Sequence, residues 1–238
     1  MTRANGPKTA DQTQVVVLMG GLGTRLGPAH AHTPKSLADV NGRPFFSYQL
    51  ELMKAAGFKN FLFLVGHHGE QIEAAFGDGA NRGVRISYSR DGERLLGTGG
   101  AIARALPLLD ERFVLIYGDS FLDIDYDEVL YRFWRGQNQG CEALMAVLEN
   151  GGRFDRSNVL LEDGVLRLYD KRNPLPAMQH IDYGVGVYER AVFKREQREA
   201  FDLADVQNAL SRAGKLACRS YRPGIMATNS RSRSAVTP

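Results

Sequence analysis

The sequence predicts an α/β fold with a Rossmann-like, mixed but mostly parallel sheet flanked by helices. Through the first half of the chain, short apolar runs alternate with stretches of helical periodicity, which is the rhythm of βαβ units. A glycine-rich turn follows the first apolar run at once, at the edge where open α/β sheets bind ligands. The 238 residues provide enough length for one substantial core.

The first strand is predicted at Val15–Leu18, because this β-branched run is typical of a buried parallel strand. Similar apolar runs predict the next strands at Phe61–Val65, Val84–Tyr88 and Phe113–Tyr117. Helical periodicity predicts helices at Pro44–Ala56, Glu70–Phe76 and Gly99–Leu109.

The pattern changes after Asp119, where the strands become short and closely spaced. Helices are expected near Tyr126–Arg135 and Ala204–Ala213. Strands are expected at Glu142–Leu148, Asn158–Leu161, Val165–Tyr169, Ile181–Tyr188 and Leu216–Tyr221. We therefore predict a single domain over residues 14–221, preceded by a flexible N-terminus (1–13) and followed by a disordered tail (222–238). Its halves are 14–120 and 121–221, and the second half is expected to hold a second substrate.

Composition excludes several functional classes. A net charge of +3, with acidic and basic residues interspersed, does not favour nucleic acid as a partner. No apolar stretch approaches the roughly twenty residues that span a bilayer, so no membrane association is expected. Cys141 and Cys218 lack the spacing of a zinc site or disulfide framework, so we expect reduced thiols and a cytoplasmic protein.

The segment Leu18–Leu37, with the sequence LMGGLGTRLGPAHAHTPKSL, suits a polyphosphate. Gly20, Gly21 and Gly23 allow backbone N–H groups to approach an anion, and Arg25 and Lys35 add fixed positive charge. The segment is not a P-loop, because no Gly-Lys-Ser/Thr closes it, and it lacks the dinucleotide fingerprint. A purely steric role for the glycines is the alternative.

Two further segments carry chemistry. Leu96–Ala101, with the sequence LGTGGA, opens a helix whose N–H groups favour a nucleotide, although Thr98 also suits simple helix capping. Asp119 comes just after an apolar strand, where a carboxylate suits Mg²⁺. This cation takes its other ligands from substrate phosphates and water. The alternative is that Asp119 only caps the following turn. Asp123, Asp125 and Asp127 lack the other EF-hand positions and are interpreted as helix-start acids.

The strings GGLGTRL, PKSL and LGTGGA, with Asp170-Lys171 after a later strand, resemble the sugar-1-phosphate nucleotidyltransferases, also called nucleotide-sugar pyrophosphorylases. The resemblance implies the nucleotide-diphospho-sugar transferase fold. It also implies an EC 2.7.7 transferase that makes NDP-sugar and pyrophosphate from an NTP and a sugar 1-phosphate with Mg²⁺. A homodimer is left open.

The resemblance assigns roles by position, with the NTP bound by the half 14–120 and the sugar phosphate by the half 121–221. It implies catalytic roles for Arg25, Lys35, Asp119 and Lys171, with Asp119 also the metal ligand. It implies NTP contacts for Met19, Gly20, Gly21, Gly23, Thr24, Gly97 and Thr98. It implies sugar contacts for Gly118, Asp170, Asp182 and Tyr183.

Two departures and several alternatives remain. Asp170 stands where the family more usually has glutamate, and the Asp-Ile-Gly-Thr-Pro-like segment that supplies a second metal ligand is missing after Tyr221. The strings GTGGAI and GDSFLDID look most like heptose-1-phosphate guanylyltransferases, followed by N-acetylmuramate-1-phosphate uridylyltransferases. A phosphocholine cytidylyltransferase and a non-catalytic nucleotide-sugar-binding protein are the other hypotheses. The segment Arg90–Arg94 does not decide which nucleobase binds.

Overall fold

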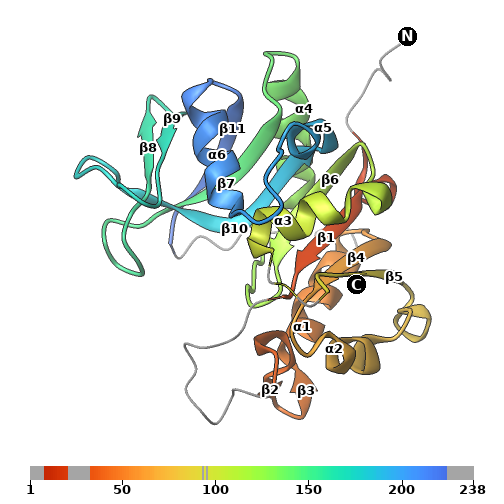
Figure 1. The fold of residues 1–238 in the computed structure, drawn as a ribbon. Helices are drawn as coiled ribbons and strands as arrows, with labels where there is room; N and C mark the ends of the chain where they lie inside the picture. Colours follow the sequence, from red (N-terminus) through yellow and green to blue (C-terminus); the bar gives the residue numbers. More distant parts are fainter. Residues whose placement is uncertain (1–7, 21–32, 93, 95, 224–238) are drawn as a thin grey trace, which may run out of the picture.

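The computed structural model describes residues 8–20, 33–92, 94 and 96–223. A nine-stranded sheet runs through it, with a main strand order of β11-β7-β10-β6-β1-β4-β5 and helices on both faces (Figure 1). A short hairpin of β2 (Asp39–Val40) and β3 (Arg43–Pro44) lies apart from this sheet. The predicted α/β architecture is confirmed.

The first half of the chain forms the parallel part of the sheet. Its strands are β1 (Gln14–Leu18), β4 (Asn60–Val65), β5 (Arg85–Arg90) and β6 (Arg112–Tyr117). Strand β1 lies between β4 and β6 and is parallel to both, with Val15–Val17 completely buried. The carboxyl ends of all four strands therefore meet at one edge of the sheet.

The second half extends the same sheet. Strand β10 (His180–Glu189) is antiparallel to both β6 and β7 (Ala143–Glu149), and β11 (Leu216–Tyr221) is parallel to β7. Strands β8 (Val159–Glu162) and β9 (Val165–Tyr169) form a hairpin that joins the sheet where β8 meets β10. The predicted strands of this half are present, within one or two residues at their ends.

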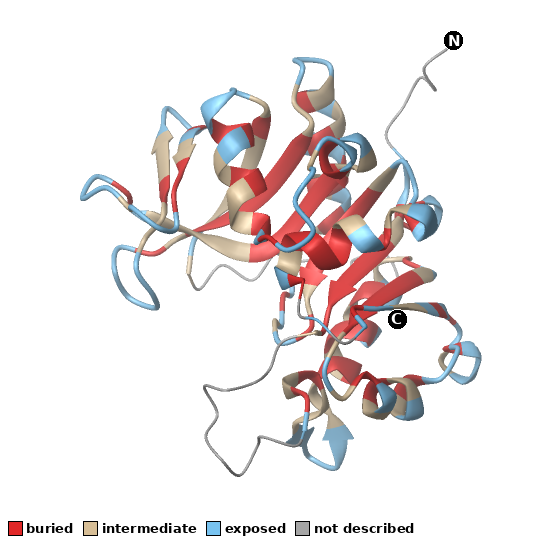
Figure 2. Cartoon of the chain, viewed as in Figure 1, coloured by how far each residue is buried: buried red, intermediate tan, exposed pale blue. Residues whose placement is uncertain are grey.

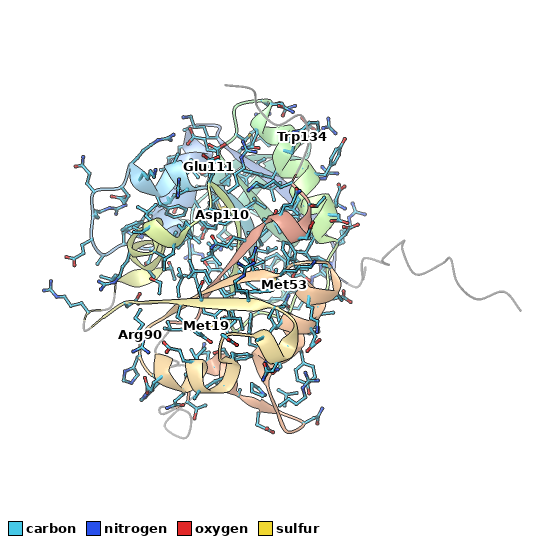
Figure 3. The ribbon with its side chains drawn as sticks, turned by 90° about the vertical axis from the view of Figure 1, so that its right-hand side faces the viewer. Met19, Met53, Arg90, Asp110, Glu111 and Trp134 are labelled. Atoms are coloured by element: carbon cyan, nitrogen blue, oxygen red, sulfur yellow. The ribbon has the colours of Figure 1, made fainter. Side chains whose placement is uncertain are left out.

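Helices cover both faces of the sheet. On one face, α1 (Phe45–Ala55), α2 (Gly69–Phe76) and α4 (Tyr126–Gln137) bury aromatic and aliphatic residues in one core cluster, and Figure 3 shows Met53 among these side chains. On the other, α3 (Gly97–Arg104), α5 (Arg190–Lys194) and α6 (Leu203–Arg212) build a second cluster. Buried residues are concentrated in the central strands of the sheet, whereas the edge strands β5 and β11 are mostly intermediate or exposed (Figure 2).

Some details differ from the sequence-based expectations. The helix expected to reach Leu109 ends at Arg104, and a 3₁₀ turn at Leu106–Leu108 follows, because Pro107 lacks the N–H that an α-helix needs. Helix α5 and the β2–β3 hairpin were not predicted. Cys141 and Cys218 are free thiols, each only partly buried. Along the described segments, none of the helices is long and apolar enough to cross a bilayer.

Candidate active site

A cavity of about 320 Å³ lies at the carboxyl edge of the parallel strands. Seven of its lining residues belong to the predicted site: Met19, Gly20, Lys35, Gly97, Thr98, Gly118 and Asp119. Seven others were not predicted as site residues: Leu18, Ser36, Leu64, Asp91, Ala101, Tyr117 and Asp202. The structure therefore brings together residues that lie far apart in the sequence.

Backbone hydrogen bonds that continue the sheet fix the floor of this cavity. The N–H of Met19 donates to Leu64 O at 2.9 Å, and the N–H of Gly118 donates to Leu18 O at 2.9 Å. Beyond the end of β5, the N–H of Asp91 donates to Val65 O at 3.0 Å. The residues just past the ends of four strands are thus held in one row, in the spatial order of β6, β1, β4 and β5.

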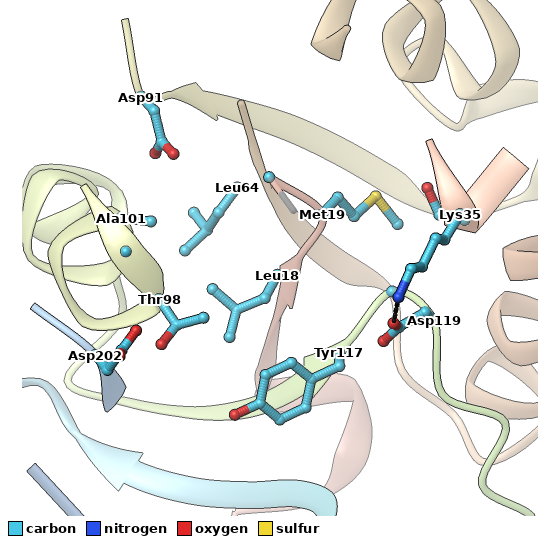
Figure 4. A pocket seen from close by; sticks show the side chains of 14 residues that line it. Leu18, Met19, Lys35, Leu64, Asp91, Thr98, Ala101, Tyr117, Asp119 and Asp202 are labelled. Carbon is cyan, nitrogen blue, oxygen red and sulfur yellow. Dashed lines mark hydrogen bonds and ion pairs between the residues drawn. The ribbon is translucent and has the colours of Figure 1, made fainter. Parts of the chain in front are cut away.

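Lys35 and Asp119 form an ion pair at one side of the cavity (Figure 4). Lys35 begins a short 3₁₀ turn, Lys35–Leu37, and its Nζ lies 3.4 Å from Oδ2 of Asp119. Both side chains remain accessible, at 29% for Lys35 and 49% for Asp119. A cation and a carboxylate that are both open to solvent can rearrange when a phosphate and its metal arrive.

The donor chemistry of this corner fits Mg²⁺. Within the described residues, no three His, Cys, Asp or Glu side chains gather as a ready-made metal cage. Mg²⁺ keeps several waters and is commonly held by one or two carboxylates together with substrate phosphates. Asp119 therefore suits an ion that arrives with a nucleotide.

The glycine-rich start of α3 has a structural explanation that the sequence did not reveal. The N–H groups of Gly99 and Gly100 donate to Phe201 O, at 2.9 and 3.1 Å. Gly97 has a φ of +72°, and a Cβ there would lie 2.6 Å from the same carbonyl oxygen. These two helical N–H groups are therefore satisfied by Phe201, and close packing accounts for the glycines.

Thr98 caps a different helix from the one expected. The N–H of Leu203, the first residue of α6, donates to Oγ1 of Thr98 at 2.8 Å. Thr98 still lines the cavity, and Asp202, which lies beside it in Figure 4, lines the cavity as well. One side chain thus joins α3, α6 and the cavity wall.

The residues expected to contact a sugar lie apart from the cavity lining, except Gly118. Oδ1 of Asp170 accepts the N–H groups of Arg172 and Asn173, at 3.1 and 2.8 Å, and Oδ2 accepts from Arg212 at 3.2 Å. The Asn173 N–H is the main cause that holds the pKa of the Asp170 carboxyl below its usual range. In this structure Asp170 organises its own loop.

Asp182 and Tyr183 are neighbours on β10 but differ in their surroundings. Asp182 accepts hydrogen bonds from the N–H of Gly184 at 2.8 Å and from Nε2 of Gln207 at 3.2 Å. Burial raises the pKa of the Asp182 carboxyl, and the charge of exposed Lys171 opposes this rise. Tyr183 packs against the cluster on the opposite face of the sheet, 5.6 Å from the ring of Tyr221.

Four predicted site residues lie outside the described residues: Gly21, Gly23, Thr24 and Arg25. Most of the predicted tail, from residue 224 onward, does so as well. Asp91 is the most informative cavity residue that sequence analysis missed. It belongs to the Arg90–Arg94 segment, yet nothing in the local sequence signals that its carboxylate is buried.

Comparison with known proteins identifies relatives of this chain. A family model described as nucleotidyl transferase matches residues 14–212. An N-acetylmuramate alpha-1-phosphate uridylyltransferase of Neisseria meningitidis is 41% identical over 48% of this chain and 49% of that protein. A D-glycero-alpha-D-manno-heptose 1-phosphate guanylyltransferase of Campylobacter jejuni is 34% identical over 66% of this chain and 68% of that protein. The match spans about half of the first relative and two thirds of the second.

Solved structures share the fold at low sequence identity. A putative glucose-1-phosphate thymidylyltransferase from Bacillus anthracis superimposes with a TM-score of 0.74 at 20% identity, covering 88% of this chain and 87% of that one. An inositol-1-phosphate CTP transferase from T. maritima gives a TM-score of 0.69 at 18% identity, covering 93% and 92%. These likenesses support the nucleotide-diphospho-sugar transferase fold.

Proposed function

Because this chain belongs to the nucleotidyl transferase family, we propose that it transfers a nucleotidyl group from an NTP to a sugar 1-phosphate, which releases pyrophosphate. The main support is the cavity at the carboxyl edge of the sheet, where Lys35 and Asp119 face each other at 3.4 Å. A polyphosphate and its cation are the ligands that such a pair of opposite charges suits.

The chain's own residues act mainly by position and charge. A phosphate oxygen of the sugar 1-phosphate attacks the α-phosphorus in line, and the bond to the β-phosphate bridging oxygen breaks. Lys35 binds the negative charge that grows on the departing pyrophosphate, which is transition-state stabilisation by a preplaced cation. Arg25, outside the described residues, is proposed to share this role.

Asp119 is the proposed Mg²⁺ ligand, with phosphate oxygens and water completing the shell. The bound ion would neutralise phosphate charge as the bond to pyrophosphate breaks. Lys171 is proposed to bind the sugar phosphate, since it is an exposed cation whose charge acts on Asp182. Asp182 is the proposed acceptor for a sugar hydroxyl.

The test is a pyrophosphate-release assay with Mg²⁺, each of the four NTPs and a panel of sugar 1-phosphates, with phosphocholine as a further acceptor. We expect release that requires both substrates. Release that NTP alone sustains would contradict the proposal. Tight binding of NDP-sugar without turnover at any Mg²⁺ concentration would instead indicate a nucleotide-sugar-binding protein.

A further inference from the structure

The side chain of Asp91 is a buried carboxylate that faces the candidate active site. Asp91 follows β5 and is only 7% exposed, yet it lines the cavity, and Figure 4 shows its carboxylate directed towards the space between Leu64 and Ala101. Among the described residues, none donates a hydrogen bond to its oxygens. These oxygens are not among the fully buried side-chain atoms that lack a partner, so they are open to the cavity and can accept hydrogen bonds from a ligand there.

Two glycines make room for this carboxylate. A Cβ on Gly20 would lie 3.3 Å from Oδ2 of Asp91, and a Cβ on Gly66 would lie 3.2 Å from the same oxygen. Larger residues at either position would press on the carboxylate or displace it. The ends of β1 and β4 thus leave Asp91 in contact with backbone on one side and with the cavity on the other.

Apolar side chains line the cavity between Asp91 and the pair of Lys35 and Asp119. Leu18 and Leu64 contribute this surface, and Figure 4 shows them between Asp91 and Ala101 on one side and the pair of Lys35 and Asp119 on the other. With its phosphates at the charged pair, a nucleotide would place its aromatic base against this apolar surface. The polar edge of the base is then presented to Asp91.

We propose that Asp91 reads the nucleobase and selects guanine, through two hydrogen bonds from N1–H and the N2 amino group to the carboxylate. This inference rests on the proposed function, whose NTP it identifies. Guanine presents two neighbouring donors on its Watson–Crick edge, and an ionised carboxylate offers two acceptors that can take a bidentate partner. Adenine and cytosine each place an acceptor beside their donor, and uracil flanks its single N–H with carbonyls.

The electrostatic surroundings are consistent with this role. Burial raises the pKa of the Asp91 carboxyl, and the charge of Arg104 acts in the opposite direction. A base that donates two hydrogen bonds favours the ionised form, so guanine binding and ionisation of Asp91 support each other.

The first experiment needs no variant. Equilibrium titration of the wild-type protein with GTP, ITP, UTP, CTP and ATP compares the bases, and ITP differs from GTP only by the N2 amino group. We expect GTP to bind most tightly and ITP to bind about 10- to 100-fold more weakly, the scale of one lost charge-assisted hydrogen bond. Equal affinity for GTP and ITP, or tighter binding of another base, would overturn the proposal.

The second experiment replaces one of the two hydrogen-bond acceptors of Asp91 with a donor. Asp91→Asn offers one acceptor and one donor, which match the N1–H and the O2 carbonyl of xanthine. The variant should lose about 10- to 100-fold in GTP affinity and gain affinity for XTP, a gain that a purely structural role cannot produce. Asp163→Asn, in the exposed turn between β8 and β9, is the matched control and should bind the nucleotides in the same order of affinity as the wild type. If Asp91→Asn bound the nucleotides in the wild-type order of affinity, Asp91 would not be the residue that selects guanine.

The two proposals fail in different ways. Pyrophosphate release that prefers UTP or CTP would remove the role of Asp91 and leave the transferase function intact. A GTP preference over ITP in binding, without pyrophosphate release for any acceptor, would support Asp91 and contradict the transferase function. The absence of binding by any of the five nucleotides would contradict both.

Discussion

The ammonium nitrogen of Lys35 lies 3.4 Å from Oδ2 of Asp119, although 84 residues separate them in the sequence. In the absence of ligand, each neutralises the other at the rim of the cavity. A phosphate with its metal ion can replace this contact by two new ones.

Replacing Lys35 should slow the transfer reaction. Lys35→Ala removes a cation that meets the growing charge on pyrophosphate, so kcat/KM should fall by about 10²-fold or more. Steady-state pyrophosphate release measures the change. Lys59→Ala, an exposed lysine just before β4 at the other end of the sheet, is the control. Turnover at the wild-type level in folded Lys35→Ala would remove Lys35 from the mechanism.

Replacing Asp119 should uncouple the metal from the nucleotide. Calorimetric titration of the wild type should show Mg²⁺ and NTP strengthening each other's binding, and Asp119→Asn should abolish both this coupling and turnover. Asp110→Asn is the control, because it also removes one negative charge but lies near the opposite end of β6, away from the cavity. Coupling of wild-type size in Asp119→Asn would place the metal elsewhere.

Replacing Lys171 should affect one substrate more than the other. Lys171→Ala should raise the KM for the sugar phosphate about 10- to 100-fold and leave the KM for NTP almost unchanged, because one charge-assisted hydrogen bond to the sugar phosphate is lost. The adjacent Arg172 is already paired with Asp205 at 2.6 Å, so Arg172→Ala is a control within the same loop. Equal increases in both KM values would argue against the proposed division of the chain.

Thr98 should contribute to stability through α6. Thr98→Val keeps the shape but leaves the N–H of buried Leu203 without its acceptor, which should lower the free energy of unfolding by about 1–3 kcal/mol. Thr98→Ser retains the hydroxyl and should lose less. Urea denaturation of the three proteins gives the comparison, and identical midpoints would mean that the hydrogen bond to Leu203 contributes nothing.

Asp182 should make stability depend on pH. Because burial raises its pKa in the folded state, the folded protein keeps the proton where the unfolded chain has already lost it. Stability should therefore fall as the pH rises from the ordinary aspartate value, about 3.9, through the higher folded value. Unfolding free energies measured at several pH values should show this fall in the wild type.

The variant Asp182→Asn should lack that contribution. Its amide oxygen can still accept from Gly184, and once the side-chain amide of Gln207 turns over, its amide nitrogen can donate to Oε1 of Gln207, a buried atom with no partner among the described residues. The wild type should therefore lose stability relative to the variant as the pH rises. Parallel curves for the two proteins would contradict the raised pKa.

The sequence predicted the sheet well because the strands are self-contained apolar runs. Phe113–Tyr117 was expected as a buried strand with a carboxylate just past its end, and the structure places Asp119 there. Local patterns of this kind need no knowledge of distant residues. The cavity-lining residues at the ends of such strands, Met19, Gly20, Gly118 and Asp119, were therefore accessible to sequence analysis.

Roles that depend on distant partners were not accessible. The glycines of α3 reflect the approach of Phe201, about a hundred positions away, and Thr98 serves α6. The burial of Asp91 depends on the absence of side chains at Gly20 and Gly66, in two other strand ends. No periodicity or local motif encodes such contacts, because they arise only when separate segments pack together.

The identity of the products tests the central claim most directly. ³¹P nuclear magnetic resonance can follow one mixture of protein, Mg²⁺, GTP and the sugar 1-phosphate that gives the fastest pyrophosphate release. The account predicts that the diphosphate signals of an NDP-sugar and the signal of pyrophosphate grow together in equal amounts while the sugar 1-phosphate signal declines. Growth of GDP and orthophosphate beside an unchanged sugar 1-phosphate would contradict it.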